Sequence, residues 1–235
     1  MSAKLQELRE TVCRANLALV EGGLAFGTFG NVSGADREAG VLVIKPSGVP
    51  YELLTPARLV AVSLETGAVV EGDLRPSSDT PTHLELVRAF GCGGVAHAHS
   101  EAATALAQAR VPLRCLGTTH ADYFRGDVPV TRDLTREEVE RDYERNTGLV
   151  IVETFRAQRL SPDEVPAVLV ASHGPFTWGP DPMAAVENAK VLEYLGRLER
   201  ATHLVAGEAV RIPAPYLVDK HFFRKHGRDS YYGQR

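Results

Sequence analysis

The sequence has little of what marks several common protein classes. Its 235 residues include only three cysteines, Cys13, Cys92 and Cys115. An odd number at wide spacing fits neither a disulfide framework nor a CxxC metal knuckle. No apolar run approaches the ~18 residues of a membrane span, and the charged start MSAKLQELRE has no apolar signal region. We therefore expect a protein of the reducing cytoplasm that has no membrane partner.

A large excess of charge of one sign is also missing. The formal net charge is −4, which argues against nucleic acid as the main partner. Neither GxGxxG nor GxxxxGK[ST] occurs, so two common nucleotide-binding loops are absent. With 44% apolar and 24% charged residues, the composition excludes a disordered chain. Because no repeat and no long Pro/Gly/Ser linker divides the chain, residues 1–235 are predicted to form one domain.

Hydrophobic spacing and turn residues predict an α/β fold. Helices are expected over 3–21, after Asp79 or Thr80, over 101–109, from Thr135 to about Arg159 with a Thr135/Glu138 capping box, and from Asp181 to about Val205. Strands are expected over 41–45, 59–64, 68–72, 93–100, around 114–118 and over 167–174. The glycine-rich segment 27–40 is expected to be a loop. Since hairpins occur beside strand–helix alternation, we expect a mixed sheet covered by helices.

The sharpest chemical feature is the sequence His97-Ala98-His99. Residues i and i+2 of a strand project from the same face, so both imidazoles can face one metal ion. His173, at the end of another apolar strand, can add a third ligand. Asp79 is the candidate carboxylate, and its alternative role is the N-cap of the following helix. The alternative for the histidines is a set of surface residues at strand ends.

Three short polar loops are suited to binding an anion. They offer hydroxyl, amide and backbone N–H donors, and Lys45 adds a positive charge. The loops are Gly30-Asn31-Val32-Ser33, Lys45-Pro46-Ser47-Gly48 and Ser77-Ser78. Their alternative interpretation is three ordinary polar turns.

Several other residues are candidates for proton transfer. They are Asp122, Glu144 and Tyr232, whose alternatives are a turn residue, an exposed helical residue and an anchor for the tail. We expect Tyr143 and Trp178 to be packing residues and His83 to be structural.

Together, these segments resemble the class II aldolase/adducin-like family, and within it the L-ribulose-5-phosphate 4-epimerases. The resemblance rests on GNVSGAD, IKPSGVPY, PSSDTPTHLELVRAF, VAHAHS, GTTHADYF, VIVETF, SHGPFTWG and the ending DKHFFRKHG…YYGQ. The GN-S, HxH and SHG motifs are shared by the family, whereas THADYF and YYGQ are typical of the epimerase branch. The departures are Phe29 in place of a tryptophan and a final Arg235, and both leave the matched site residues intact.

The resemblance implies a role for each matched residue. The implied metal site consists of Asp79, His97, His99 and His173. Zinc is the usual ion, and the residues themselves would also permit manganese or cobalt. The implied phosphate pocket consists of Asn31, Ser47, Gly48, Ser77 and Ser78, with Lys45 close by. Asp122 and Tyr232 match the acid/base pair, and the supporting positions are Thr118, Glu144, His221 and Arg224. The family fold is a three-layer α/β/α sandwich around a largely antiparallel sheet, and the family assembles as a C4 homotetramer with sites between subunits.

The expected activity is therefore the interconversion of L-ribulose 5-phosphate and D-xylulose 5-phosphate. In these sugars C4 is β to the carbonyl, so its hydrogen is not acidic and simple deprotonation cannot invert it. Deprotonating the C4 hydroxyl instead lets the C3–C4 bond break into a metal-bound enediolate and glycolaldehyde phosphate, whose rotation and re-addition invert C4. This route needs two acid/base groups on opposite faces. The alternatives are an L-fuculose-phosphate-type aldolase and a non-catalytic adducin-like module.

Overall fold

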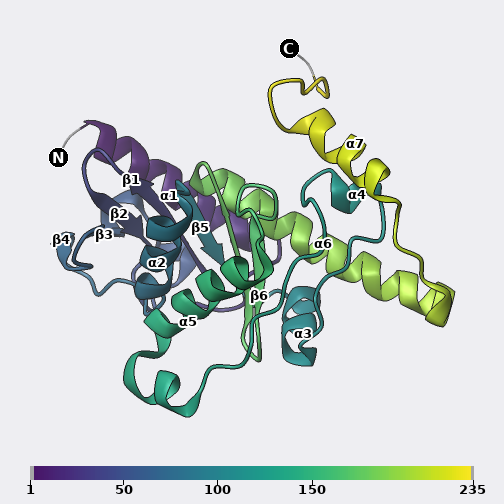
Figure 1. Ribbon diagram of the computed structural model, residues 1–235. Helices are drawn as coiled ribbons and strands as arrows, with labels where there is room; N and C mark the ends of the chain where they lie inside the picture. The colour runs from purple at the N-terminus through teal and green to yellow at the C-terminus, as the bar shows by residue number, and fades with distance from the viewer. Residues whose placement is uncertain (1–2, 234–235) are drawn as a thin grey trace.

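The structure is a computed structural model that describes residues 3–233 (Figure 1). Gln234, which ends the predicted YYGQ motif, and Arg235 lie outside the described residues. The strands are β1 (Asn31–Asp36), β2 (Val41–Ile44), β3 (Val60–Ser63), β4 (Val69–Glu71), β5 (Gly94–His97), β6 (Ala167–Val170) and β7 (Gly174–Gly179). The α-helices are α1 (Ala3–Glu21), α2 (Thr80–Phe90), α3 (Glu101–Ala109), α4 (Thr118–Ala121), α5 (Arg136–Gln158), α6 (Pro182–Ala206) and α7 (Pro215–Lys225).

The seven strands of the described chain form one sheet in the order β4-β3-β2-β1-β5-β7-β6. Every neighbouring pair is antiparallel, and an isolated parallel bridge joins Val130 to Leu169. The predicted helices over 3–21 and 101–109 are confirmed, and the Thr135/Glu138 capping box starts α5 as expected.

Helices cover both faces of the sheet (Figure 1). Leu42 and Val95 pack in the core that α2 and α5 share, while the next residues along each strand, Val43 and Ala96, pack in the cores that contain α1. This alternation is what a sheet buried on two faces requires. The three-layer α/β/α sandwich predicted for the chain is thereby confirmed.

The segment 27–40 is a correction, because it contains the central strand β1 and is not only a loop. Apart from Val32, the residues of β1 have low strand propensity, but close packing of the helices requires a residue as small as glycine at position 34. A Cβ placed at Gly34 would lie 2.7 Å from Pro182 of α6 and 2.8 Å from Val12 of α1. The helices therefore press directly onto the strand, and this contact decides its structure.

Three further expectations about strands are wrong. The strand expected over 93–100 ends at His97, so His99 lies beyond it. Residues 114–118 form no strand; Leu113 makes one isolated bridge to Val128, and α4 begins at Thr118. The apolar run 167–174 is also not one strand, since β6 ends at Val170 and β7 begins at Gly174. Ser172 takes a left-handed φ of +62° between them, which makes the connection a tight turn. His173 therefore lies in a turn between two paired strands.

At the C-terminal end, α7 packs against α4. This contact brings the basic, aromatic tail of the chain beside Asp122. Among the helices of residues 3–233, none combines the length and apolar character that a membrane crossing requires.

Candidate active site

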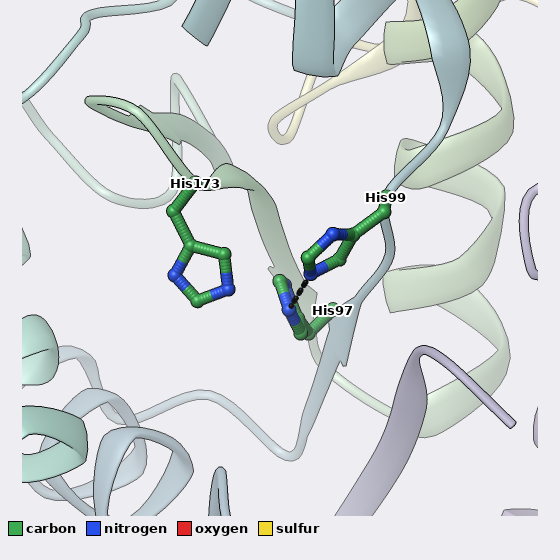
Figure 2. Close-up of side chains that lie close together, drawn as sticks. All are labelled: His97, His99 and His173. Atoms are coloured by element: carbon green, nitrogen blue, oxygen red, sulfur yellow. Dashed lines mark hydrogen bonds between the residues drawn. The ribbon is translucent and has the colours of Figure 1, made fainter. Parts of the chain in front are cut away.

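Three histidines meet at one end of the central strands. His97 ends β5, His99 follows two residues later, and His173 lies in the β6–β7 turn. Their ligand nitrogens all lie within 4.8 Å of one another, and Nε2 of His97 is 3.0 Å from Nε2 of His99. Figure 2 shows the three rings turned toward one another. Nitrogens around a tetrahedral zinc ion are roughly 3.4 Å apart, so these residues fit such an ion after a small inward movement of a ring.

Hydrogen bonding and burial prepare the rings as ligands. Nδ1 of His97 lies 2.9 Å from the Pro175 carbonyl, which can only accept, so the proton resides on Nδ1 and Nε2 carries a lone pair. Burial lowers the pKa of His97 despite the nearby Asp79 carboxylate. Burial, together with His97 and His99, lowers the pKa of His173 to about 4. Both rings are consequently neutral near pH 7, which is the form that binds metals.

Asp79 lies beside the histidines and outside the group of three ligand nitrogens. It is the N-cap residue of α2 by position, as the sequence indicates, but its side chain makes no capping hydrogen bond, so capping does not account for the carboxylate. Its Oδ2 instead accepts a 2.6 Å hydrogen bond from Nδ2 of Asn31. Burial raises the pKa of the Asp79 carboxyl, but His97, His83 and the Asn31 hydrogen bond outweigh that effect and hold it below its usual value. The carboxylate is therefore an anion that faces the imidazoles.

A cavity of about 330 Å³ collects the predicted metal and phosphate residues. Its walls include all ten of them: Asn31, Lys45, Ser47, Gly48, Ser77, Ser78, Asp79, His97, His99 and His173. These residues come from separate parts of the sequence, and the sheet brings them together. The alternative of unrelated polar turns is thus not what the structure shows.

Backbone hydrogen bonds hold two of the polar loops side by side. The Ser47 N–H donates to the Arg75 carbonyl at 2.9 Å, and the Ser77 N–H donates to the Lys45 carbonyl at 3.0 Å. Lys45 itself is only 2% exposed, and its ammonium lies 3.4 Å from the Thr28 carbonyl and 4.7 Å from the centre of the Tyr51 ring. Burial lowers the pKa of Lys45, although Asp79 opposes that effect. A buried ammonium of this kind attracts an anion strongly, because water screens it poorly.

Asn31 presents a different group to the cavity from the one that a phosphate needs. Its amide nitrogen donates to Asp79, whereas its buried Oδ1 has no hydrogen-bond partner among the described residues. The free group is an acceptor, which suits a hydroxyl donor better than a phosphate dianion.

Comparison with known proteins identifies the family. The model of the Class II Aldolase and Adducin N-terminal domain matches residues 10–199. The chain belongs to this family. Among solved structures, an L-fuculose 1-phosphate aldolase is 26% identical with a TM-score of 0.75, covering 94% of this chain and 97% of that one.

Two further class II aldolase-like structures are similar over most of the chain. YgbL from Klebsiella pneumoniae, described only as an aldolase, epimerase or decarboxylase, is 26% identical with a TM-score of 0.72, covering 92% of this chain and 98% of its own. The L-fuculose-1-phosphate aldolase from Thermus thermophilus is 26% identical with a TM-score of 0.65, covering 88% of this chain and 99% of its own. The family that the sequence motifs resemble is therefore confirmed.

The predicted acid/base residues of this chain lie together at a place away from the histidines. Arg224 of α7 donates to both carboxylate oxygens of Asp122, at 2.9 and 2.6 Å, and Nδ1 of His221 lies 3.0 Å from Oδ1. The Arg224 guanidinium lies 5.0 Å from the centre of the Tyr232 ring. We call Thr118, Asp122, His221, Arg224, Lys225 and Tyr232 the α4–α7 cluster. None of them lines the 330 Å³ cavity, so one described chain does not bring them to the histidines.

The charges of the α4–α7 cluster keep Asp122 ionised. Burial raises its pKa, but the hydrogen bonds from Arg224 and His221 and the charge of Lys225 outweigh burial and lower it. Glu144 lies apart from this cluster, on α5, in a cleft that it shares with Ser77 and Ser78. It is therefore near the phosphate loops of its own chain.

Aromatic residues from other segments, Tyr143 and Phe29 among them, contact the histidines. Tyr143, which the sequence indicates only as a packing residue, has its hydroxyl 3.1 Å from Nδ1 of His173. Phe29, the departure from the family pattern, stacks on His99 with ring centres 5.9 Å apart. No motif singles out Tyr143, because the residue it contacts lies 30 positions later in the sequence.

Proposed function

We propose that this class II aldolase-family chain is a metal-dependent epimerase that interconverts L-ribulose 5-phosphate and D-xylulose 5-phosphate. The observation that carries the proposal is the cavity that combines three neutral imidazoles with the donors of two phosphate-binding loops. A substrate that spans this cavity needs a metal-binding oxygen pair at one part and a phosphate at another. A phosphorylated 2-ketopentose has both.

His97, His99 and His173 would hold the divalent ion, zinc being the usual ion for such a site, with Asp79 beside them. When bound, the ion supplies Lewis-acid stabilisation of negative charge that develops on the carbonyl side of the substrate. Lys45, Ser47, Gly48, Ser77 and Ser78 bind the phosphate group. Because they hold the phosphate throughout, glycolaldehyde phosphate stays in the cavity after the C3–C4 bond breaks. Its aldehyde group can then rotate to present its other face before the C3–C4 bond forms again.

The acid/base step is assigned to Asp122 and Tyr232, with Thr118, His221, Arg224 and Glu144 in support. We propose that the α4–α7 cluster serves the cavity of a neighbouring subunit in a homotetramer. Two observations support this assignment: the cluster does not line its own chain's cavity, and Tyr232 is 61% exposed. Asp122, held ionised by Arg224, can take the C4 hydroxyl proton on one face, and the Tyr232 phenol can act on the other.

An aldolase of the L-fuculose-phosphate type is the second candidate, because similar structures carry that name. Such an enzyme would use the same cavity but release the aldehyde. The preference for the epimerase rests on the THADYF segment and on the YYGQ tail, which supply Asp122 and Tyr232. A non-catalytic module is disfavoured because the three histidines remain together.

A product assay tests the proposal. The zinc-loaded protein is incubated with L-ribulose 5-phosphate, and the mixture is followed by ¹³C NMR. D-Xylulose 5-phosphate at equilibrium, with no free aldehyde, is the expected result. Stoichiometric glycolaldehyde phosphate would establish the aldolase instead. A protein that binds no metal and turns over neither sugar would favour the non-catalytic module.

A further inference from the structure

The Nδ1 atoms of His97 and His173 have different hydrogen-bond partners. The Pro175 carbonyl beside His97 can only accept a hydrogen bond, which fixes the proton on Nδ1. Beside His173 is the hydroxyl of Tyr143, at 3.1 Å from Nδ1, and the two rings stack with centres 6.1 Å apart. In Figure 2 His173 turns one ring nitrogen toward His97 and His99 and the other away from them. The contact with Tyr143 is therefore on the side of the ring away from the cavity.

The direction of this hydrogen bond decides whether His173 can be a ligand. A neutral imidazole has one N–H, so Nε2 has a free lone pair only if the proton is on Nδ1. We propose that Tyr143 is a positioning residue whose hydroxyl oxygen accepts the Nδ1 proton of His173 and so keeps Nε2 available to the metal ion. The inference rests on the metal role proposed above for His173.

The fold holds Tyr143 firmly in this place. Asp142 has a non-helical backbone (φ −154°, ψ 65°), so α5 kinks there and Tyr143 begins its second segment. Across the kink, Nδ2 of Asn146 donates to the Glu138 carbonyl at 2.9 Å. On the other side of Tyr143, the Thr82 hydroxyl of α2 donates to the Glu144 carbonyl at 2.5 Å. Hydrogen bonds thus fix the backbone on both sides of Tyr143, and its side chain is half-buried. These contacts define its position more closely than surface packing alone would.

A phenol oxygen has lone pairs as well as a proton, so it can accept the Nδ1 proton of His173 at the 3.1 Å distance while its own hydrogen is donated elsewhere. Partners of this kind on the second nitrogen of a metal-bound histidine orient the ring and fix its tautomer.

Tyr143→Phe tests the proposal because it keeps the ring and removes the oxygen. The zinc dissociation constant, measured by competition with a chelator, should rise about 10- to 100-fold. Tyr194→Phe is the matched control, since Tyr194 is 56% exposed on α6, and it should leave the constant unchanged. In the His173→Asn background, Tyr143→Phe should have no further effect, because the residue through which it acts is gone.

A second measurement needs no substitution. Long-range ¹H–¹⁵N NMR spectra of the metal-free parent protein should show His173 with its proton on Nδ1. A proton on Nε2, or a change in zinc affinity below about twofold in Tyr143→Phe, would overturn the proposal. So would an equal loss of affinity in the His173→Asn background. A parent protein that binds no zinc would overturn the metal role as well, whereas a zinc-binding parent with an unaffected Tyr143→Phe variant removes only this inference.

Discussion

At the scale of the single residue, His97 has both a structural role and a predicted chemical role. Its ring stacks on Phe176 with centres 4.1 Å apart, and it pairs with Asn31 across β1 and β5. The main hydrophobic cores are built from other residues of the sheet and helices. The site can therefore be removed without removing what stabilises most of the fold.

We predict that His97→Asn abolishes zinc binding and lowers turnover to near the uncatalysed level, while the far-UV circular dichroism spectrum is retained. The reason is that asparagine cannot replace the imidazole Nε2 at the same distance. His203→Asn, at an exposed position of α6, is the control and should keep both zinc and activity. Full zinc occupancy in His97→Asn would contradict the site.

The phosphate contacts give the second residue-scale prediction. Ser47→Ala removes one neutral donor to a dianion, which should cost on the order of 1.5–3 kcal/mol. Because the phosphate is bound alike before and during the reaction, KM should rise about tenfold or more with kcat nearly unchanged. Ser63→Ala, in the β3–β4 hairpin, is the control. An unchanged KM in a Ser47→Ala/Ser78→Ala double variant would remove this pocket from the mechanism.

At the scale of elements, the close contact of α2 with α5 positions residues on two sides of the three histidines. Asp79 directly precedes α2, and Tyr143 lies on α5. A Cβ on Gly148 of α5 would lie 2.7 Å from the Glu85 Cβ and 3.1 Å from the Thr82 carbonyl oxygen. The separation of these helices therefore depends on the absence of one side chain.

Gly148→Ala should force the two helices apart and destabilise the protein by about 1–3 kcal/mol. Urea unfolding followed by fluorescence measures this change, and zinc affinity should fall as well because Tyr143 moves away from His173. Gly117→Ala is the control for stability, since a Cβ there meets no atom within 4 Å. Equal unfolding midpoints for the two variants would show that the helices adjust freely.

The sequence predicts helices better than it predicts β1 and α4. The helix over 3–21 has regular apolar spacing, that over 101–109 is rich in alanine, and that from Thr135 starts with a capping box, all of which are local signals. Strand β1 is specified by helices that press on Gly34 from distant parts of the sequence. The four residues of α4 are similarly placed by packing against α7.

The candidate site also contains some residues that the sequence predicts and others that it does not. Its ten metal and phosphate residues are found from motifs, and they line one cavity as those motifs predict. The position of Tyr143 could not be predicted. It depends on the helix kink at Asp142, and no proline or glycine in the sequence indicates a kink there. The predicted roles of Asp122 and Tyr232 still depend on contacts beyond one chain.

At the scale of the whole molecule, buried histidines should make stability depend on pH. Burial lowers the pKa of His83 to about 3 and that of His120 to about 4, from an ordinary value of 6.5. Below about pH 6.5 the unfolded chain therefore binds more protons than the folded one. The free energy of unfolding of the metal-free protein should fall as the pH falls from about 6.5 to about 4.

Urea midpoints across this range measure the effect, and His83→Asn should flatten the dependence because one of the responsible groups is gone. Val205→Ala, at an exposed position with no titratable group, should leave the slope as it is in the parent. The same slope in the parent and in His83→Asn would mean that other groups cause the acid sensitivity.

The proposed assembly gives a further whole-molecule prediction. Tyr232→Phe keeps the metal residues, and His97→Asn keeps the acid/base residues. If each site combines two subunits, unfolding the two variants together and refolding them should place intact sites at about a quarter of positions. Activity should then rise well above either variant alone. Mixed tetramers that are verified by mass yet stay inactive would mean that Tyr232 acts within its own chain or not at all.

The pairing of Asn31 with His97 has a practical consequence for anyone who prepares this protein. Side chains alternate across a sheet, so a slip of one residue in the pairing of β1 would turn Asn31 toward α1 and α6 and send Val32 out of its core. A chain whose strands are mispaired in this way would have no enzymatic activity, even if it remained compact. Specific activity is thus a gauge of folding fidelity, and batches produced under different expression conditions can be ranked by it.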